Sequence, residues 1–333
     1  MKNRIHYFIY KGFLFFLLTV SFTHATYAQH ITLGNENVNV EIGLNFGPTF
    51  FLGDLGGHRG YGTTFIKDLN LPLTKLMKGV FVSVQPNEWL AYRLAAQYTY
   101  VAGKDKIINT TGTNELYRKY RNLDFKSDIW EAYTAIEIFP IMLLNLGNED
   151  YQPKLRPYVF GGVGVFHFNP QGSLTDANGN KTWHYLKPLH TEGEGFPEYP
   201  NRKPYSLTQI NIPMGAGFKY SLFDNINIGF ELLYRKTFTD YIDDVSTTYI
   251  DRALFNKYLS PADANIALQI NDKTTTSGNI GYTRTDPGSQ RGNSKNNDAY
   301  FSLLFKLGLR LTSDDEGNYN KRSSSHVRCP ARF

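Results

Sequence analysis

The chain of 333 residues contains a single cysteine, Cys329. One cysteine cannot close an intrachain disulfide, and metal motifs built from paired cysteines are excluded with it. The sequence also lacks a glycine-rich phosphate-binding motif and a nucleophile elbow. We therefore expect a protein that is not an enzyme, that uses no cofactor and that has no evident small-molecule substrate.

A concentrated basic charge is missing as well. The chain has 35 Lys and Arg against 30 Asp and Glu, a formal net charge of +5. Three of the positive charges, Lys2, Arg4 and Lys11, precede the first acidic residue, Glu36, so the chain beyond residue 28 carries only +2. Because nucleic-acid binding needs a basic face, we exclude nucleic acid as a partner.

Long apolar runs are absent beyond the N-terminal segment, which excludes a multi-helix membrane protein. The N-terminal segment combines basic residues, a short apolar stretch at 12–22 and a small residue, Ala28, before a plausible cleavage site. This order is typical of a secretory signal peptide at residues 1–28, and the stretch is short for an uncleaved membrane anchor. Since no cysteine lies near the cleavage site, we do not expect a lipoprotein.

Aromatic residues and glycine are abundant, with 23 Tyr, 24 Phe and 29 Gly. Apolar and polar residues alternate with a period of two through much of the chain, which predicts half-buried strands rather than helices. Eight segments show the pattern or resemble it: 38–52, 79–85, 90–101, 127–141, 156–168, 210–222, 226–234 and 301–311.

The linkers between these segments alternate in length. Those at 86–89, 144–155 and 224–225 are short or moderate, whereas those at 56–74, 106–126, 172–205 and 245–297 are long and polar. Short turns at one end and long loops at the other are typical of an outer-membrane barrel. A soluble β-sandwich or a soluble ligand-binding barrel would also alternate, but the small, glycine-rich polar faces suit a narrow lumen.

We therefore predict an all-β fold, an eight-stranded antiparallel up-and-down transmembrane β-barrel at residues 29–311. It would lie in the cell outer membrane, surrounded by outer-membrane lipid, with its long loops extracellular. Residues 249–269 have loosely helical spacing, and Ser260 followed by Pro261 is typical of a helix start. The longest loop is therefore expected to carry one or two short helices.

Charged residues on the faces opposite the apolar ones would point into the lumen. An unpaired charge there is costly, so we predict a structural network of both signs that closes the barrel. An ion pathway, the alternative, would favour one sign and a wider bore. We expect each arginine of this set to lie near one of its glutamates. The set is Glu41, Arg93, Glu131, Glu137, Lys219, Glu231, Arg235, Lys306 and Arg310.

Two further groups call for a functional hypothesis beside a structural one. His167 ends a predicted strand, where lipid-modifying barrels carry a catalytic histidine, but without a serine partner on its face we interpret it as a rim residue. Acidic residues gather where a strand enters the longest loop. These residues are Asp240, Asp243, Asp244 and Asp251. We interpret them as an acidic loop entry and keep a divalent-cation site as the alternative.

Residues 312–333 follow the last predicted strand and would form a basic periplasmic tail. The last 17 residues contain four positive charges and no acid, together with Cys329. Such a tail is either unstructured or a tether for a partner.

Three stretches carry a resemblance to a known family. They are Phe-Leu-Gly-Asp-Leu-Gly-Gly at 51–57, Arg-Lys-Thr-Phe-Thr-Asp-Tyr-Ile-Asp-Asp-Val-Ser at 235–246 and Gln-Arg-Gly-Asn at 290–293. The chain resembles a Bacteroidota family of small outer-membrane barrels that includes the PorG-type proteins of the type IX secretion system. The resemblance implies a non-enzymatic barrel that is an accessory or structural component of that machinery, in contact with periplasmic secretion-ring subunits. The alternative is a stand-alone structural or adhesion-like barrel without a secretion role.

Overall fold

The computed structural model describes residues 38–56, 73–108, 114–146, 153–176, 178–223, 225–274 and 285–311. The predicted signal peptide at 1–28, the basic tail at 312–333 with Cys329, and most of the linker at 56–74 lie outside the described residues. Those assignments stay predictions.

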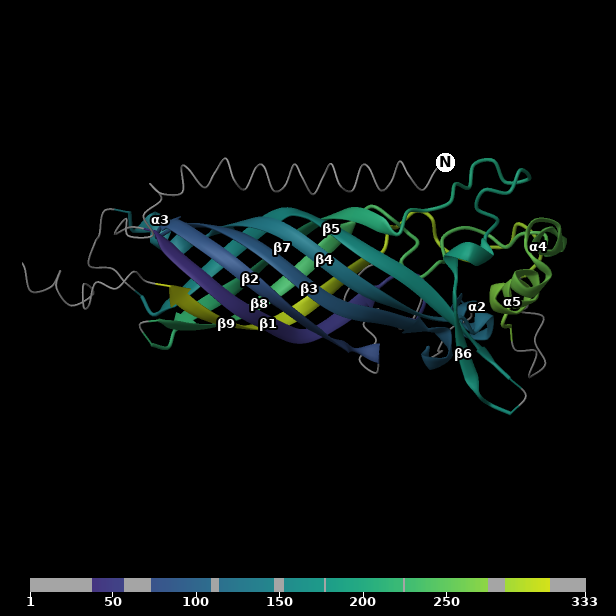
Figure 1. Ribbon diagram of the computed structural model, residues 1–333, viewed down its shortest axis with the longest axis horizontal. Coiled ribbons are helices and arrows are strands. Elements are labelled where there is room, and N and C mark those ends of the chain that lie inside the picture. The colour runs from purple at the N-terminus through teal and green to yellow at the C-terminus, as the bar shows by residue number, and fades with distance from the viewer. Residues whose placement is uncertain are drawn as a thin grey trace, which may run out of the picture.

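Eight strands form a closed antiparallel barrel, as predicted. Strand β1 pairs with both β2 and β9, and β4 pairs with β5, so the sheet closes on itself (Figure 1). The wall consists of β1 (Asn39–Leu52), β2 (Lys75–Asn87), β3 (Leu90–Lys104), β4 (Asp124–Ile138), β5 (Leu155–Thr175), β7 (Thr208–Ser221), β8 (Ile226–Thr237) and β9 (Ala299–Leu311).

Each predicted segment corresponds to one of these strands, with ends that differ by up to seven residues, and the C-terminal ends of β4 and β5 are two examples. The segment predicted at 127–141 ends as a strand at Ile138, because Pro140 cannot donate to the ladder and begins the short helix α3 (Pro140–Leu144). Strand β5 continues to Thr175, past the predicted end at 168. Its last residues pair with an additional strand outside the ring, β6 (Lys181–Tyr185).

The two faces of the wall differ as a membrane barrel requires. On β1, Leu44 is 55% exposed on the outer surface, whereas its neighbour Asn45 is 2% exposed in the lumen. On β4, Trp130 is 62% exposed and the adjacent Glu131 is buried. An apolar outer surface around a polar interior is the arrangement that lipid imposes on a transmembrane barrel.

The helices are short and lie outside the wall. They are α2 (Asn114–Arg121), α3, α4 (Ala253–Tyr258), α5 (Pro261–Asn271) and the 3-10 helices η3 (Asp105–Ile107) and η4 (Lys187–Leu189). The predicted start of α5 is confirmed, because the Ser260 side chain accepts a hydrogen bond from the Asp263 backbone N at 3.2 Å. Within the described ranges, no helix is long and apolar enough to cross a membrane.

The long connections gather at one end of the barrel, which we call the loop end; the other is the turn end. Figure 1 shows α2, α4, α5 and β6 together beyond the loop end. We call the described residues within 53–56, 105–123, 176–207 and 238–298 the cap. An apolar core of its own includes Leu189, Phe196 and Phe255, and a second cluster, with Leu55, Ile242 and residues of β4, β5 and β9, packs the cap onto the barrel.

Candidate functional site: the lumen, the cap and the turn end

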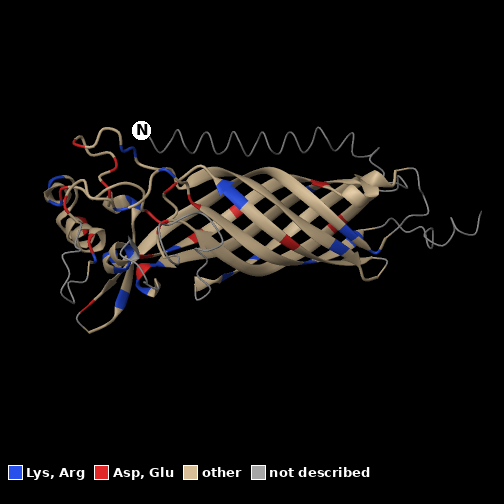
Figure 2. Cartoon of the chain, turned by 180° about the vertical axis from the view of Figure 1, so that it is seen from behind, with Lys and Arg blue, Asp and Glu red and all other residues tan. Residues whose placement is uncertain are grey.

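The nine charged residues predicted for the lumen all lie at inward-facing strand positions. Arg310 is half-buried at the end of β9, and the other eight are at most 6% exposed. Figure 2 shows both signs of charge along the barrel wall as well as in the cap. The eight buried residues are four acids and four bases, Glu41, Arg93, Glu131, Glu137, Lys219, Glu231, Arg235 and Lys306.

Arg93 on β3 holds the largest group together. Its guanidinium contacts Glu137 on β4 and, from the far side of the lumen, Glu231 on β8, with Nη2 2.6 Å from Glu231 Oε2. The same carboxylate accepts the Tyr158 hydroxyl at 2.6 Å and lies 3.2 Å from Lys306 Nζ. Strands on opposite sides of the barrel are therefore joined through one charged cluster.

Arg235 on β8 organises a second group nearer the loop end. Its Nε donates to Glu131 Oε2 at 3.2 Å, and its Nη1 donates to Ser302 Oγ at 2.7 Å. Glu131 also accepts from Asn211 Nδ2 at 2.6 Å and from the Gln97 amide. The ion pairs predicted for Arg93 and Arg235 are thus both present.

Arg310 does not join this network. It faces Glu41 across the β1–β9 pair, but Glu41 instead binds Lys219 Nζ at 2.8 Å and Asn227 Nδ2 at 3.0 Å. Among the described residues, no ion pair within 4 Å joins Arg310 to a glutamate; it contacts Asn227 Oδ1 at 3.5 Å. The predicted pairing is therefore wrong at this position, because the side chain lies at the strand end and reaches water.

Large side chains fill the space around the charged groups. Tyr133, Tyr158 and Tyr300 are at most 2% exposed, and the centre of the Phe160 ring lies 4.8 Å from the Arg93 guanidinium. A cavity beside Glu41 and Lys306 has a volume of about 10 Å³, which holds at most a single water molecule. The described lumen is packed as the interior of an eight-stranded barrel should be.

Charged residues also tie the cap together. Glu192 accepts hydrogen bonds from the backbone N of Ser246 at 3.0 Å and of Thr247 at 2.8 Å, and its Oε1 pairs with Arg291 Nη1 at 2.9 Å. The same Arg291 nitrogen donates to the Asp244 carbonyl at 2.7 Å. The third long connection is thereby fixed to both ends of the fourth.

Arg121 performs the same role for the first two connections. Its Nε pairs with Asp105 Oδ2 at 2.7 Å, its Nη2 donates to the Asp54 carbonyl at 2.8 Å, and its Nη1 donates to the Arg291 carbonyl. All four long connections are therefore held in one body.

The acidic residues predicted at the loop entry separate in the structure. Asp244 accepts from Thr191 and Tyr205 at 2.5 and 2.6 Å, and Asp251 accepts from the Ala253 backbone N at 3.0 Å in an exposed turn. Only Asp240 and Asp243 stay together. In the part of the chain that the structure describes, no group of three or more His, Cys, Asp or Glu is arranged to hold a metal ion.

Two further aspartates, which the sequence did not indicate, lie beside Asp240 and Asp243 and form a cluster of four carboxyls with them. Asp54 follows β1 and Asp298 precedes β9, and the closing β1–β9 pair brings them beside Asp240 and Asp243. Burial, followed by the neighbouring carboxylates Asp54 and Asp243, raises the pKa of Asp240 to about 9. Burial also raises the pKa of Asp243 and of Asp298 well above the usual range. We refer to these four residues as the carboxyl cluster of the cap.

His167 lies on the outer face of β5 near the loop end, as a rim residue would. Its Nδ1 is 3.0 Å from Thr208 Oγ1, and this threonine is its hydrogen-bond partner. Its position beside Trp130 follows from the β4–β5 register.

The turn end has a cavity of about 290 Å³ at the mouth of the barrel. Lys154, Arg156 and Arg310 line it, with Glu88 as the acidic residue among the lining side chains. Phe223 in the β7–β8 turn also lines it and is 62% exposed. This end therefore offers basic groups beside an apolar ring.

A scan against protein-family models finds no match for the chain, and a search of curated protein sequences finds none either. Solved structures do match in part. The Ail attachment invasion locus protein of Yersinia pestis, in complex with the heparin analogue sucrose octasulfate, is 8% identical with a TM-score of 0.32; the match covers 82% of this chain and 99% of that one.

Two other matches are of the same quality. The outer membrane protein OprG of Pseudomonas aeruginosa is 10% identical over 83% of this chain and 96% of its own, with a TM-score of 0.32. A major outer membrane protein of Thermus thermophilus is 11% identical over 82% and 99%, with a TM-score of 0.35. The fold itself is defined by the strand pairing described above.

Proposed function

We propose that this chain is a non-enzymatic outer-membrane barrel that serves as an accessory or structural component of the type IX protein secretion machinery. The observation that carries the proposal is where the stretches of family resemblance lie. Residues 51–57, 235–246 and 290–293 are far apart in the sequence, yet their described parts meet at the base of the cap.

The contacts between the three stretches are direct. The Asp54 backbone N donates to Asp243 Oδ2 at 3.0 Å, and the Asn293 backbone N donates to Asp54 Oδ2 at 2.5 Å. Arg291 then joins the Asp244 carbonyl at 2.7 Å. A resemblance spread over three contacting segments indicates one shared structural unit, which supports membership of the PorG-type family more strongly than three isolated matches.

The packed lumen supports a role other than transport through this barrel. Its interior is occupied by side chains and by the charged network, so its work would be done at its two ends. At the turn end, which faces the periplasm in an outer-membrane barrel with long loops outside, the basic mouth suits an acidic segment of a secretion-ring subunit.

Co-purification tests this role. We expect the tagged full chain, extracted from its own outer membrane, to bring down periplasmic ring subunits. The double variant Lys154→Glu and Arg310→Glu should lose them, because it reverses charge at the turn end. Lys203→Glu with Lys295→Glu, exposed in the cap at the opposite end, is the matched control and should retain them.

Two results would count against the proposal. Equal recovery of ring subunits with the turn-end variant would place the contact elsewhere. Failure of the unmodified chain to bring down any ring subunit would leave the stand-alone barrel as the better interpretation. That second candidate is favoured by the cap, since four connections locked into one body present a rigid surface for adhesion outside the cell.

A further inference from the structure

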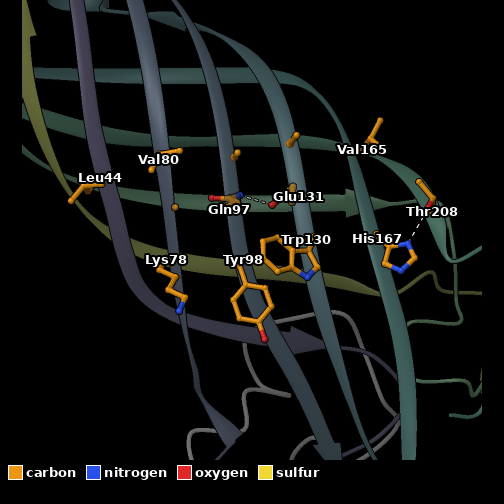
Figure 3. Close-up of a pocket in the computed structure, with 13 residues that line it drawn as sticks. Leu44, Lys78, Val80, Gln97, Tyr98, Trp130, Glu131, Val165, His167 and Thr208 are labelled. Carbon is orange, nitrogen blue, oxygen red and sulfur yellow. Dashed lines mark hydrogen bonds between the residues drawn. The ribbon is translucent and has the colours of Figure 1, made fainter. Parts of the chain in front are cut away.

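A hollow lies on the outer wall of the barrel in the half nearer the loop end; it covers β2 to β5 and reaches Leu44 on β1 and Thr208 on β7. Lys78, Tyr98, Trp130 and His167 are register partners on successive strands, and all four face outward in one row (Figure 3). The hollow beside this row has a volume of about 690 Å³. Its position on a convex wall requires a local reason.

Two alanines provide that reason. Ala96 and Ala132 are register partners in the next outward-facing row, between the larger Val80 and Val165. Their methyl groups are too small to cover the wall, so the inward-facing Gln97 and other residues of the strands also line the hollow. A neighbouring hollow of about 710 Å³ shares Ala96 and Ala132 and extends along the wall toward the turn end.

The edge of the hollow nearer the loop end is aromatic and cationic. The Tyr98 and Trp130 rings lie 4.7 Å apart, and the Tyr98 hydroxyl donates to Asp128 at 2.8 Å, which holds the pair in place. Lys78 Nζ lies 5.6 Å from the centre of the Tyr98 ring, and Lys75 Nζ lies 4.9 Å from the centre of the Tyr100 ring. Such belts of aromatic and basic side chains are found at the level of lipid headgroups.

We propose that this hollow is a binding site for an anionic, phosphate-bearing lipid of the outer leaflet. The hydrocarbon chain would lie over Ala96 and Ala132, and the headgroup phosphate would lie against the Lys78 ammonium. The apolar lining of the hollow suits a hydrocarbon chain, and the cation at its headgroup end favours a lipid of negative charge. The site rests on the proposed placement of the barrel in the outer membrane, though not on its role in secretion.

Trp130 lines the hollow and provides a direct probe. The chain has three tryptophans, so Trp89→Phe with Trp183→Phe leaves Trp130 as the single tryptophan in the full-length protein, and its emission can be excited apart from that of the tyrosines. This protein would be placed in phosphatidylcholine vesicles that contain a small fraction of phosphatidylglycerol with brominated chains, which quench tryptophan on contact. We expect quenching well above that of the same fraction of brominated phosphatidylcholine.

Variants separate the two halves of the site. Lys78→Gln should lower the preference for the anionic lipid about fivefold, as expected for one lysine near a membrane surface. Lys236→Gln removes an exposed lysine from β8 and should leave the preference unchanged. Ala132→Leu should fill the hollow and reduce quenching by the anionic lipid. Ala216→Leu on β7, outside the hollow, should leave the quenching unchanged.

The outcomes are distinguishable. Equal quenching by the two brominated lipids, or equal effects of the Lys78 and Lys236 variants, would overturn the lipid site while leaving the barrel in the membrane. No quenching by either lipid would place Trp130 outside the bilayer and overturn the membrane placement with it. Neither result depends on whether ring subunits co-purify.

Discussion

Glu231 is the residue on which most of the central luminal contacts depend. Its two oxygens contact Arg93, Lys306 and the Tyr158 hydroxyl, and it is 3% exposed. A buried ion pair contributes little compared with an apolar replacement of both partners, but removal of one partner leaves an uncompensated charge. The network is therefore sensitive to single substitutions.

We expect Glu231→Leu to destabilise the barrel by about 3–5 kcal/mol, the usual cost of breaking a buried pair. The measurement is the urea dependence of the heat-modifiable gel shift in detergent. Glu198→Leu, which removes an acid paired with Lys257 on the cap surface, is the control and should not shift the transition. Similar midpoints for the two variants would show that the luminal pairs are dispensable.

From the carboxyl cluster of the cap we predict a loss of cap stability at alkaline pH. The pKa of Asp240 is raised to about 9 from an unfolded value near 3.8, first by burial and then by Asp54 and Asp243. A raised folded pKa means that the protonated form stabilises the fold. This contribution is complete below about pH 4 and is lost as pH rises through about 9.

Proteolysis of the cap should therefore accelerate between pH 7 and pH 10, and Asp240→Asn should reduce that acceleration because asparagine cannot ionise. Asp251→Asn, in an exposed turn, is the matched control. A cap equally resistant at both pH values in the unmodified chain would contradict the buried, protonated state of this residue.

At the scale of elements, alternation predicted the eight wall strands because each one separates lipid from a narrow polar lumen. Strand β6 has no such contrast: four of its five residues are exposed, so its sequence carries no period of two. Inward position likewise predicted which charges enter the lumen. Their partners also depend on which side chains meet across the lumen: Glu41 faces Arg310 in the β1–β9 register but binds Lys219 on β7.

Strand β5 offers a test of the wall with two adjacent glycines. A Cβ added at Gly162, which faces inward, would lie 2.0 Å from the Thr134 carbonyl oxygen, whereas one added at Gly161 would meet nothing within 4 Å. We expect Gly162→Ala to disrupt the β4–β5 pairing and impair folding. Gly161→Ala should be neutral or stabilising by up to about 1 kcal/mol. Refolding yield into detergent measures both, and equal yields would contradict the close approach of the strands.

At the scale of the whole molecule, the chain is a filled cylinder that carries a rigid body at one end. The order of short and long linkers predicted which end would carry the loops. It did not predict that the loops would form one body, because contacts such as Glu192 with Arg291 join residues whose spacing carries no periodic signal. Two members of the carboxyl cluster of the cap, Asp54 and Asp298, escaped prediction for the same reason, whereas Asp240 and Asp243 were predicted together at the loop entry.

The filled lumen leads to a prediction about conduction. In planar bilayers, the unmodified protein should produce no stable, large channels, because Arg93, Tyr133 and Tyr158 occupy the lumen together with the rest of the network. Glu231→Leu should also remain closed, although less stable, since the leucine and the surrounding rings still fill an eight-stranded bore. Stability and closure are thus separable properties of the same side chains. Stable, large channels from the unmodified chain would reject the closed lumen, and their appearance only in the variant would assign closure to the ion pairs rather than to packing.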